Sequence, residues 1–427
     1  MTTKAAIAKL QPGDVLVIGD GHYIGADWMI AINGLNGTAE KPITIRSAGD
    51  GGAWLDGEGK NRPIYIYRSS HIIVEGLDAS NSGDSVVEAS GSNNITLRRI
   101  CAWDAADNNT QIFGVHHGEH NLIEDCAGWG IARKIFSASQ GGNHNTFRRC
   151  FGRWEGSHVV GPKCTFGLIY NNQQNTFENC IGTWDPISMK ETYVLLDYSG
   201  KPWAGAGAGT YTNYKVQNPY AIFAADGAYS NPELTPPGRK AGLKVRGCIA
   251  YTLVSDRSIV LFAGIFATKA DDIEIAGCAV SIAQNIKPFL LSRNPGGTND
   301  HLVAKWLLTK GEAASYIHPA WKTSIAGKLP ERYWQDSGDI DGNGEVDLGD
   351  IGILATNWGK TVYGLSEGDL NGDGVVDVGD KGIVTAHYET AKPLWPWPME
   401  DRIRQAMIRS GRQPISVTRQ VKEAFGE

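Results

Sequence analysis

Two short segments near the C-terminal end carry the densest group of side chains able to bind a metal ion. The first runs from Asp339 to Asp350, and the second repeats it 30 residues later, from Asp369 to Asp380. Oxygen-bearing residues stand at segment positions 1, 3, 5, 9 and 12, and a glycine at position 6 permits a sharp turn. Hard oxygen ligands at this spacing, with a main-chain carbonyl at position 7, fit calcium. The sequence therefore predicts two calcium ions, bound by Asp339, Asp341, Asn343, Glu345, Asp347 and Asp350 in the first loop and by Asp369, Asn371, Asp373, Val375, Asp377 and Asp380 in the second.

Cationic side chains form a second group, earlier in the chain. They follow the tryptophans of three successive sequence repeats by four to six residues. If those tryptophans are equivalent, the cations lie on one face, where a base and positive charge would meet. Scattered, solvated surface charges are the alternative. The catalytic candidates are Lys134, His158 and Lys190, which follow a tryptophan in this way, and the nearby Arg153. The substrate-binding candidates are Arg133, which also follows a tryptophan, the nearby Lys163, and the tryptophans Trp129 and Trp154.

Acidic side chains directly follow three of the four repeat tryptophans, at Asp104, Glu155 and Asp185. Two carboxylates at a suitable separation can protonate a glycosidic oxygen and activate water, which is the chemistry of a glycoside hydrolase. The same acids can instead pair with nearby arginines and hold turns in place. Both interpretations remain open at this point.

The elements that position these residues follow from an internal repeat. Between Asn94 and Cys180 one pattern occurs four times, and taking Ile100, Cys126, Cys150 and Cys180 as equivalent gives steps of 26, 24 and 30 residues. Each unit has a short alternating run followed by turn residues, and no helical pattern separates the runs. Strands that recur in this way stack as a solenoid. The sequence predicts an all-β fold, a right-handed parallel β-helix, over roughly residues 12–300.

Two rows of identical residues are expected inside this solenoid. Five of the seven cysteines occupy one repeat position, so they should form an inward ladder of thiols and no disulfides. Four asparagines recur at one turn and should hydrogen-bond along the axis. The cysteines are Cys126, Cys150, Cys180, Cys248 and Cys278, and the asparagines are Asn94, Asn121, Asn145 and Asn175.

The 427 residues divide into three parts by composition. Residues 1–335 form the solenoid, interrupted at about 186–240 by a stretch that predicts long loops. Residues 336–390 carry twelve acidic and two basic side chains, and residues 391–427 carry seven basic and four acidic ones and should form a helical tail docked on the body. The solenoid itself is nearly neutral, which argues against nucleic acid as a partner. No apolar run approaches the ~20 residues needed to cross a membrane.

Residues 337–390 resemble a type I dockerin module, because the loop pair ends in aspartate at position 12. The resemblance implies a small helical domain of two EF-hand-like calcium loops, and a cohesin domain as partner. Leu348-Gly349 and Val378-Gly379 stand where such modules carry hydroxyl residues that read the partner. An intramolecular role, in which the module caps or braces the solenoid, is the alternative.

The N-terminal stretch resembles pectate-lyase-like β-helix proteins, especially the alginate lyase and chondroitinase B type. The resemblance rests on residues 10–23, on residues 37–45 and on Leu55-Asp56-Gly57. It implies a carbohydrate-active protein in which a lysine acts as base, an arginine on a neighbouring coil assists, and calcium neutralises a uronate carboxylate. It also implies a place outside the cell or on its surface, although the chain opens without the pattern of a secretory leader.

Three function classes follow from these patterns. The first is a lyase that cleaves an anionic polysaccharide by β-elimination. The second is a glycoside hydrolase that uses the acidic row. The third is a β-helix without catalytic activity that binds glycans or builds an extracellular assembly.

Overall fold

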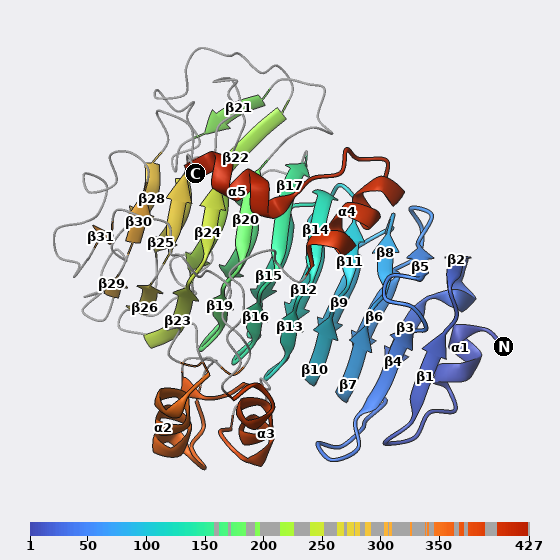
Figure 1. Ribbon diagram of the computed structural model, residues 1–427. Coiled ribbons are helices and arrows are strands. Elements are labelled where there is room, and N and C mark those ends of the chain that lie inside the picture. Colours follow the sequence, from blue (N-terminus) through green and yellow to red (C-terminus); the bar gives the residue numbers. More distant parts are fainter. Residues whose placement is uncertain are drawn as a thin grey trace.

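The computed structural model describes residues 1–157, 162–169, 172–184, 193–196, 214–225, 240–251, 263–268, 271–276, 278–281, 287–291, 303–305, 307–309, 325–326, 338, 340, 346–362, 367–370, 375–388 and 399–425. Their strands form three parallel sheets that wind around one axis (Figure 1). Sheet A contains β1 (Val15–Ile18), β4 (Ile43–Ser47), β7 (Ser70–Glu75), β10 (Asn93–Arg98), β13 (Leu122–Glu124), β16 (Thr146–Arg148), β19 (Thr176–Glu178), β23 (Lys240–Arg246), β26 (Asp271–Ala276) and β29 (Val303–Lys305).

The other two sheets follow the same order along the chain. Sheet B contains β2 (Gly21–Ile24), β5 (Ala53–Asp56), β8 (Asp78–Ser80), β11 (Cys101–Trp103), β14 (Ala127–Ile131), β17 (Phe151–Gly156), β20 (Ile181–Trp184), β24 (Ile249–Tyr251), β27 (Ala279–Ser281), β30 (Leu307–Thr309) and β31 (Ile325–Ala326). Sheet C contains β3 (Ile30–Asn33), β6 (Ile64–Tyr67), β9 (Val87–Ser90), β12 (Gln111–His116), β15 (Lys134–Ser139), β18 (Pro162–Ile169), β22 (Tyr214–Ala225), β25 (Ala263–Thr268) and β28 (Lys287–Leu291). The prediction of a parallel β-solenoid is confirmed.

The inside of the solenoid is filled by stacked rows of like residues. Phe136 stacks between Phe113 and Phe166, with ring centroids 4.6 and 4.8 Å away and ring planes within 5°. The five predicted cysteines form the expected ladder, and all seven cysteines are free and buried. Each ladder thiol donates to a carbonyl of the preceding coil, for example from Cys150 Sγ to the Ile123 oxygen at 3.4 Å. Such identical neighbours explain why the sequence repeats.

The asparagine ladder is present in three of its four expected positions. Asn145 Oδ1 accepts hydrogen bonds from the main-chain and side-chain nitrogens of Asn121, at 3.0 and 2.9 Å, and Asn175 Oδ1 accepts from the Asn145 amide at 2.8 Å. Asn94 is not part of it. Ile95 occupies the ladder position instead, because its amide donates to Asn121 Oδ1 at 2.8 Å. Asn94 has a left-handed backbone, with φ of 54°, which asparagine tolerates well.

The four coil tryptophans are not equivalent in the structure, although they occupy similar places in the four sequence repeats. Trp103 pairs with Trp129, but Trp129 stands opposite Arg153, and Trp154 stands opposite Gly130. The tryptophan therefore comes one residue later in the third and fourth coils, and a shift of one residue along a strand reverses the side-chain direction. Trp103 and Trp129 lie on the outer face of sheet B, whereas Trp154 and Trp184 stack inside the core.

Two C-terminal helices, α4 (Glu400–Arg409) and α5 (Val417–Phe425), cover the outer face of sheet B (Figure 1). The covered face is apolar and includes Trp103, Trp129 and Phe151. Met407 and Val421 are among the wholly buried helix residues that pack on it. At the other end, the short helix α1 (Thr3–Ile7) buries Ile7 against the first coil, and a 3-10 turn, η1 (Ala26–Trp28), follows β2.

A second helix pair, α2 (Leu348–Asn357) and α3 (Val378–His387), begins at position 10 of each predicted calcium loop and contains its position-12 aspartate. It has its own small core of paired positions. Ile340 corresponds to Leu370, Val346 to Val376 and Leu354 to Val384. In Figure 1 the pair lies against the end of sheet A near β16 and β23.

Residues 186–240, for which the sequence predicts long loops, include two described strands before Lys240. β22 occupies a place in sheet C between β18 and β25, and β21 (Tyr193–Leu196) pairs with it. β22 thus contributes a strand of the solenoid within this stretch. In the part of the chain that the structure describes, no helix is long and apolar enough to cross a membrane.

Candidate functional site

Lys134 begins β15 on sheet C and is almost wholly buried, with 2% of its surface exposed. It lies opposite Gln111 of β12 and Cys164 of β18. Burial, which disfavours the charged ammonium, and the nearby charge of Arg133 together lower the pKa of Lys134 to about 7. A lysine with such a pKa is largely an uncharged amine in mildly alkaline solution, as a proton-accepting base must be.

A second lysine lies beside it. Lys163 precedes Cys164 on β18, so it lies one residue from the direct strand neighbour of Lys134. It is also buried, and burial and the charge of Arg133 lower its pKa to about 7. Arg133 is 9% exposed and donates from Nη1 to Asn109 Oδ1 at 2.6 Å. Lys134, Lys163 and Arg133 are called the basic cluster from here on.

His116 of β12 stands next to this cluster. Its Nδ1 is 2.7 Å from Ser139 Oγ and its Nε2 is 3.0 Å from Gln111 Oε1. Because the amide oxygen can only accept, Nε2 carries the proton and Nδ1 accepts from the serine hydroxyl. Burial and the charge of Lys134 lower the pKa of His116 to about 4, so this imidazole is neutral.

The hydroxyl of Ser137, on the same strand as Lys134, is buried and has no hydrogen-bond partner among the described residues. Phe136 and Ala138 on either side belong to the core, so Ser137 faces outward from sheet C. Buried polar atoms are normally hydrogen-bonded, and one that is not deserves an explanation.

The structure brings three predicted site residues together and separates a fourth. Arg133 lies close enough to Lys134 and to Lys163 for its charge to lower both lysine pKa values. Arg153 does not join them, because it lies on β17 of sheet B and binds Glu155, with Nε 2.9 Å from Oε1. The cause is the later place of Trp154 in its coil, which puts Arg153 at the outward position that Trp129 occupies in the coil before.

Two acids of the row, Asp104 and Glu155, bind an arginine of the C-terminal tail. Arg412 Nη1 and Nη2 are 2.8 and 2.7 Å from the two carboxylate oxygens of Asp104, and Nη2 is 2.9 Å from Glu155 Oε2. Glu155 is wholly buried and is shared by Arg153 and Arg412. Carboxylates neutralised in this way hold structure together, which is the second of the two interpretations left open by the sequence.

Neither of the two tryptophans named as substrate-binding candidates has an accessible ring. Trp129 is covered by the tail, and its Nε1 donates to Ser410 Oγ at 3.2 Å. Trp154 lies in the core, where its Nε1 donates to the Ala132 oxygen at 2.7 Å. Neither ring is therefore exposed to a substrate in this structure. His158, Lys190 and Asp185 lie outside the described residues.

In the acidic loops the described residues include both position-12 aspartates. Asp350 and Asp380 are fully buried. Asp350 Oδ1 accepts from the Ile340 amide at 2.5 Å and Oδ2 from the Asp347 amide at 2.7 Å. Among the described residues, no group of three or more Asp, Glu, His or Cys side chains is placed to hold a metal ion, so calcium binding by these loops stays a prediction. Asp339, Asp341, Asn343, Glu345, Asn371 and Asp373 lie outside the described residues, and Asp369, Val375 and Asp377 lie within them.

Sequence reasoning missed His116, Gln111, Asn109 and Cys164. The repeat was traced through cysteines and tryptophans, which mark sheets A and B. Sheet C carries no cysteine or tryptophan row, so its strands could not be aligned with one another from the sequence and its outward residues could not be assigned. The stacked Phe113, Phe136 and Phe166 were the available signal, since they align β12, β15 and β18.

No protein-family model matches this sequence. No curated protein matches it significantly. Similar solved structures include an alginate lyase from a Paenibacillus species, with 13% identity over 76% of this chain and 96% of that chain and a TM-score of 0.39. A pectate lyase shares 12% identity over 79% of this chain and 77% of its own, with a TM-score of 0.41. A rhamnogalacturonan lyase shares 14% over 75% and 80%, with a TM-score of 0.45. Similarity at this level does not say what this chain binds or cleaves.

Proposed function

We propose that this protein is a polysaccharide lyase that cleaves an anionic, uronate-containing polymer by β-elimination, with Lys134 as the base. One observation carries the proposal. Two buried lysines, each with a pKa of about 7, lie beside Arg133 on one side of the solenoid. Burying three cationic side chains together is costly, and strongly shifted pKa values cluster at functional sites.

The chemistry of elimination matches this arrangement. The uncharged amine of Lys134 takes the proton from the carbon next to the carboxylate, and the electron pair left behind forms the new carbon–carbon double bond. The bond to the glycosidic oxygen breaks with its electrons, and that oxygen takes up a proton. Arg133, which stays charged, stabilises the negative charge that builds on the carboxylate, and Lys163 can donate a hydrogen bond to it. The Ser137 hydroxyl, which has no partner among the described residues, can bind a sugar hydroxyl.

We also propose that residues 336–390 form a dockerin-like module of two EF-hand-like loops that binds two calcium ions and braces its own solenoid. The buried Asp350 and Asp380 and the paired core around Leu354 and Val384 support the module. Two contacts with sheet A support the intramolecular role over a cohesin-like partner. Arg148 Nη2 donates to the Leu370 oxygen at 2.7 Å, and Lys244 pairs with Glu367. We place the protein outside the cell or on its surface, where such polymers occur.

The activity is tested with a panel of uronate and neutral glycans. Unsaturated products absorb in the ultraviolet, whereas hydrolysis creates reducing ends without that absorbance. Lys134→Met should lower turnover at least ~10²-fold, the contribution of a positioned acid–base group. The matched control is Arg153→Met, which removes a buried cation on sheet B and should leave the rate per folded molecule unchanged. Equal rates in wild type and Lys134→Met would contradict the proposal.

A further inference from the structure

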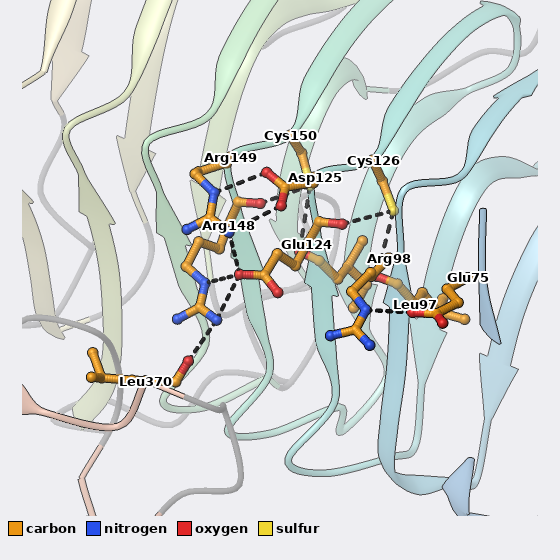
Figure 2. A network of polar contacts seen from close by, with 11 residues as sticks. Glu75, Leu97, Arg98, Glu124, Asp125, Cys126, Arg148, Arg149, Cys150 and Leu370 are labelled. Atoms are coloured by element: carbon orange, nitrogen blue, oxygen red, sulfur yellow. Dashed lines mark hydrogen bonds and ion pairs between the residues drawn. The ribbon is translucent and has the colours of Figure 1, made fainter. Parts of the chain in front are cut away.

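Leu370 joins the second acidic loop to the solenoid through both of its main-chain polar groups. Its amide donates to Oδ1 of Asp380, the position-12 residue of that loop, at 2.6 Å. Its carbonyl accepts from Nη2 of Arg148 at 2.7 Å, as Figure 2 shows. Leu370 is wholly buried, so this short path from Arg148 to Asp380 is shielded from water.

Arg148 is itself held firmly on sheet A. Its side chain is 2% exposed, and its Nε donates to Glu124 Oε1 at 2.8 Å (Figure 2). Burial alone would raise the pKa of Glu124, but Arg148 and Arg149 outweigh it and lower this pKa to about 2. Glu124 therefore stays ionised and fixes the guanidinium that holds the loop.

The ion pairs belong to a row of alternating charges along sheet A. Arg98, Glu124 and Arg148 stand opposite one another on β10, β13 and β16. Arg98 binds Glu75 at 2.7 Å, on the side away from the module (Figure 2). Arg98 therefore neighbours Glu124 as Arg148 does and carries the same guanidinium group. Among the described residues, it binds Glu75 of the preceding coil and not the module.

The first acidic loop is built alike but lacks this tie. The Ile340 amide donates to Asp350 Oδ1 just as that of Leu370 does to Asp380. Within the described residues, no solenoid side chain binds the Ile340 carbonyl. In that part of the chain, the contact with Arg148 thus belongs to the second loop and not to the first.

We infer that ion binding in the second loop and docking of the module on sheet A are thermodynamically linked through Arg148. The inference rests on the calcium binding proposed above. An ion that orders Asp380 also fixes the Leu370 amide and, with it, the carbonyl that Arg148 binds. By reciprocity, docking that fixes Leu370 raises the affinity of the second loop for its ion. The first loop gains nothing from the same contact.

The test isolates each loop in the full-length protein and titrates it with calcium by calorimetry. Asp350→Asn disables the first loop, and Asp380→Asn disables the second. Arg148→Met in the Asp350→Asn background should weaken calcium binding about tenfold, within the usual range of coupling between sites. The same change in the Asp380→Asn background should leave the affinity unaltered. Arg98→Met is the matched control and should have no effect in either background.

A second variant guards against misfolding of Arg148→Met. Lys244→Met removes the ion pair with Glu367 at the partly exposed edge of the interface, and it should also weaken only the second loop. Hydrogen exchange of the β16 amides gives the reciprocal measurement, because removal of calcium should speed their exchange in the wild type.

Each outcome decides between the two proposals. Equal calcium affinity with and without Arg148, or an equal loss in both loops, overturns the linkage while leaving calcium binding intact. Absence of any calcium binding overturns both. Neither result bears on the lyase assay, which measures the basic cluster on another face.

Discussion

Arg412 in the tail and Asp104 in the solenoid form a two-pronged ion pair across 308 residues of sequence, with N–O distances of 2.7 and 2.8 Å. The same guanidinium reaches Glu155 at 2.9 Å. This contact fixes the segment that joins α4 to α5 over the apolar face of sheet B. It gives the two carboxylates a structural role.

Arg412→Met should therefore destabilise the protein by about 3 kcal/mol, because it leaves the buried Glu155 and the partly buried Asp104 with one partner fewer. Chemical denaturation measures the loss. Arg404→Met is the control on the same tail, since Arg404 is 59% exposed and pairs with the neighbouring Asp401. It should change stability by less than about 0.5 kcal/mol.

Asp104→Asn separates structure from catalysis in the same region. It should lower stability and leave turnover of a uronate polymer unchanged in the folded fraction. Parallel denaturation and rate measurements on the one variant check both. Loss of turnover without loss of stability would return the acidic row to the active site and favour a hydrolase.

The pH dependence of the rate should report Lys134. Its pKa is lowered to about 7, so the amine is protonated and inactive below that value and free above it. The rate should rise about tenfold between pH 6 and pH 8, as the uncharged fraction does. Initial rates across this range measure it. Lys163→Met, with the neighbouring lysine removed, should retain the rise, and a flat profile in the wild type would exclude Lys134 as the base.

The same two lysines make stability depend on pH in a defined direction. Their pKa values are about 7 in the folded protein and near 10.4 in the unfolded chain, so the unfolded state binds more protons between those values. Stability should therefore increase as pH rises from about 7 towards 10. Denaturation at several pH values should show a smaller slope in Lys134→Met.

Removal of calcium should loosen the acidic module and spare the coils. Without the ion, the carboxylates of Asp347 and Asp350, with the other acids of that loop, repel one another in a small volume. Limited proteolysis with a chelator should cut within residues 336–390 and leave the solenoid fragment intact. Cleavage that is equal with and without calcium, or that begins in the coils, would count against the metal site.

The asparagine ladder should be a major source of local stability. Asn145→Ala deletes side-chain hydrogen bonds to both Asn121 nitrogens and to the Gly118 oxygen, all of them buried. The cost should be about 3 kcal/mol or more, measured by denaturant unfolding. Asn94→Ala is the control, because Asn94 lies outside the ladder and loses only its preference for a left-handed backbone, at about 1 kcal/mol.

The sequence by itself determined the features that depend on local repetition. A solenoid places like residues on like residues. The recurrence of Cys126, Cys150 and Cys180 therefore predicts both that the coils stack and that these side chains point into the core. The spacing of the acidic residues in the two loops is equally local, because it is contained in twelve consecutive residues of each loop. Lys134 is a candidate base because of an offset counted from tryptophans that are not equivalent, and its catalytic role stays a prediction.

Only the tertiary structure decided the contacts between distant segments. Nothing in the residues around Asp104 and Glu155 indicates that Arg412 neutralises them, and nothing near Leu370 points to Arg148. Trp154 points into the core and Trp129 points outward, because Trp154 comes one residue later in its strand than Trp129 does. The two sequence motifs are too similar to show this shift. Such contacts depend on which surfaces pack together after the chain has folded. Burial in the folded protein also lowers the pKa values of Lys134 and Lys163.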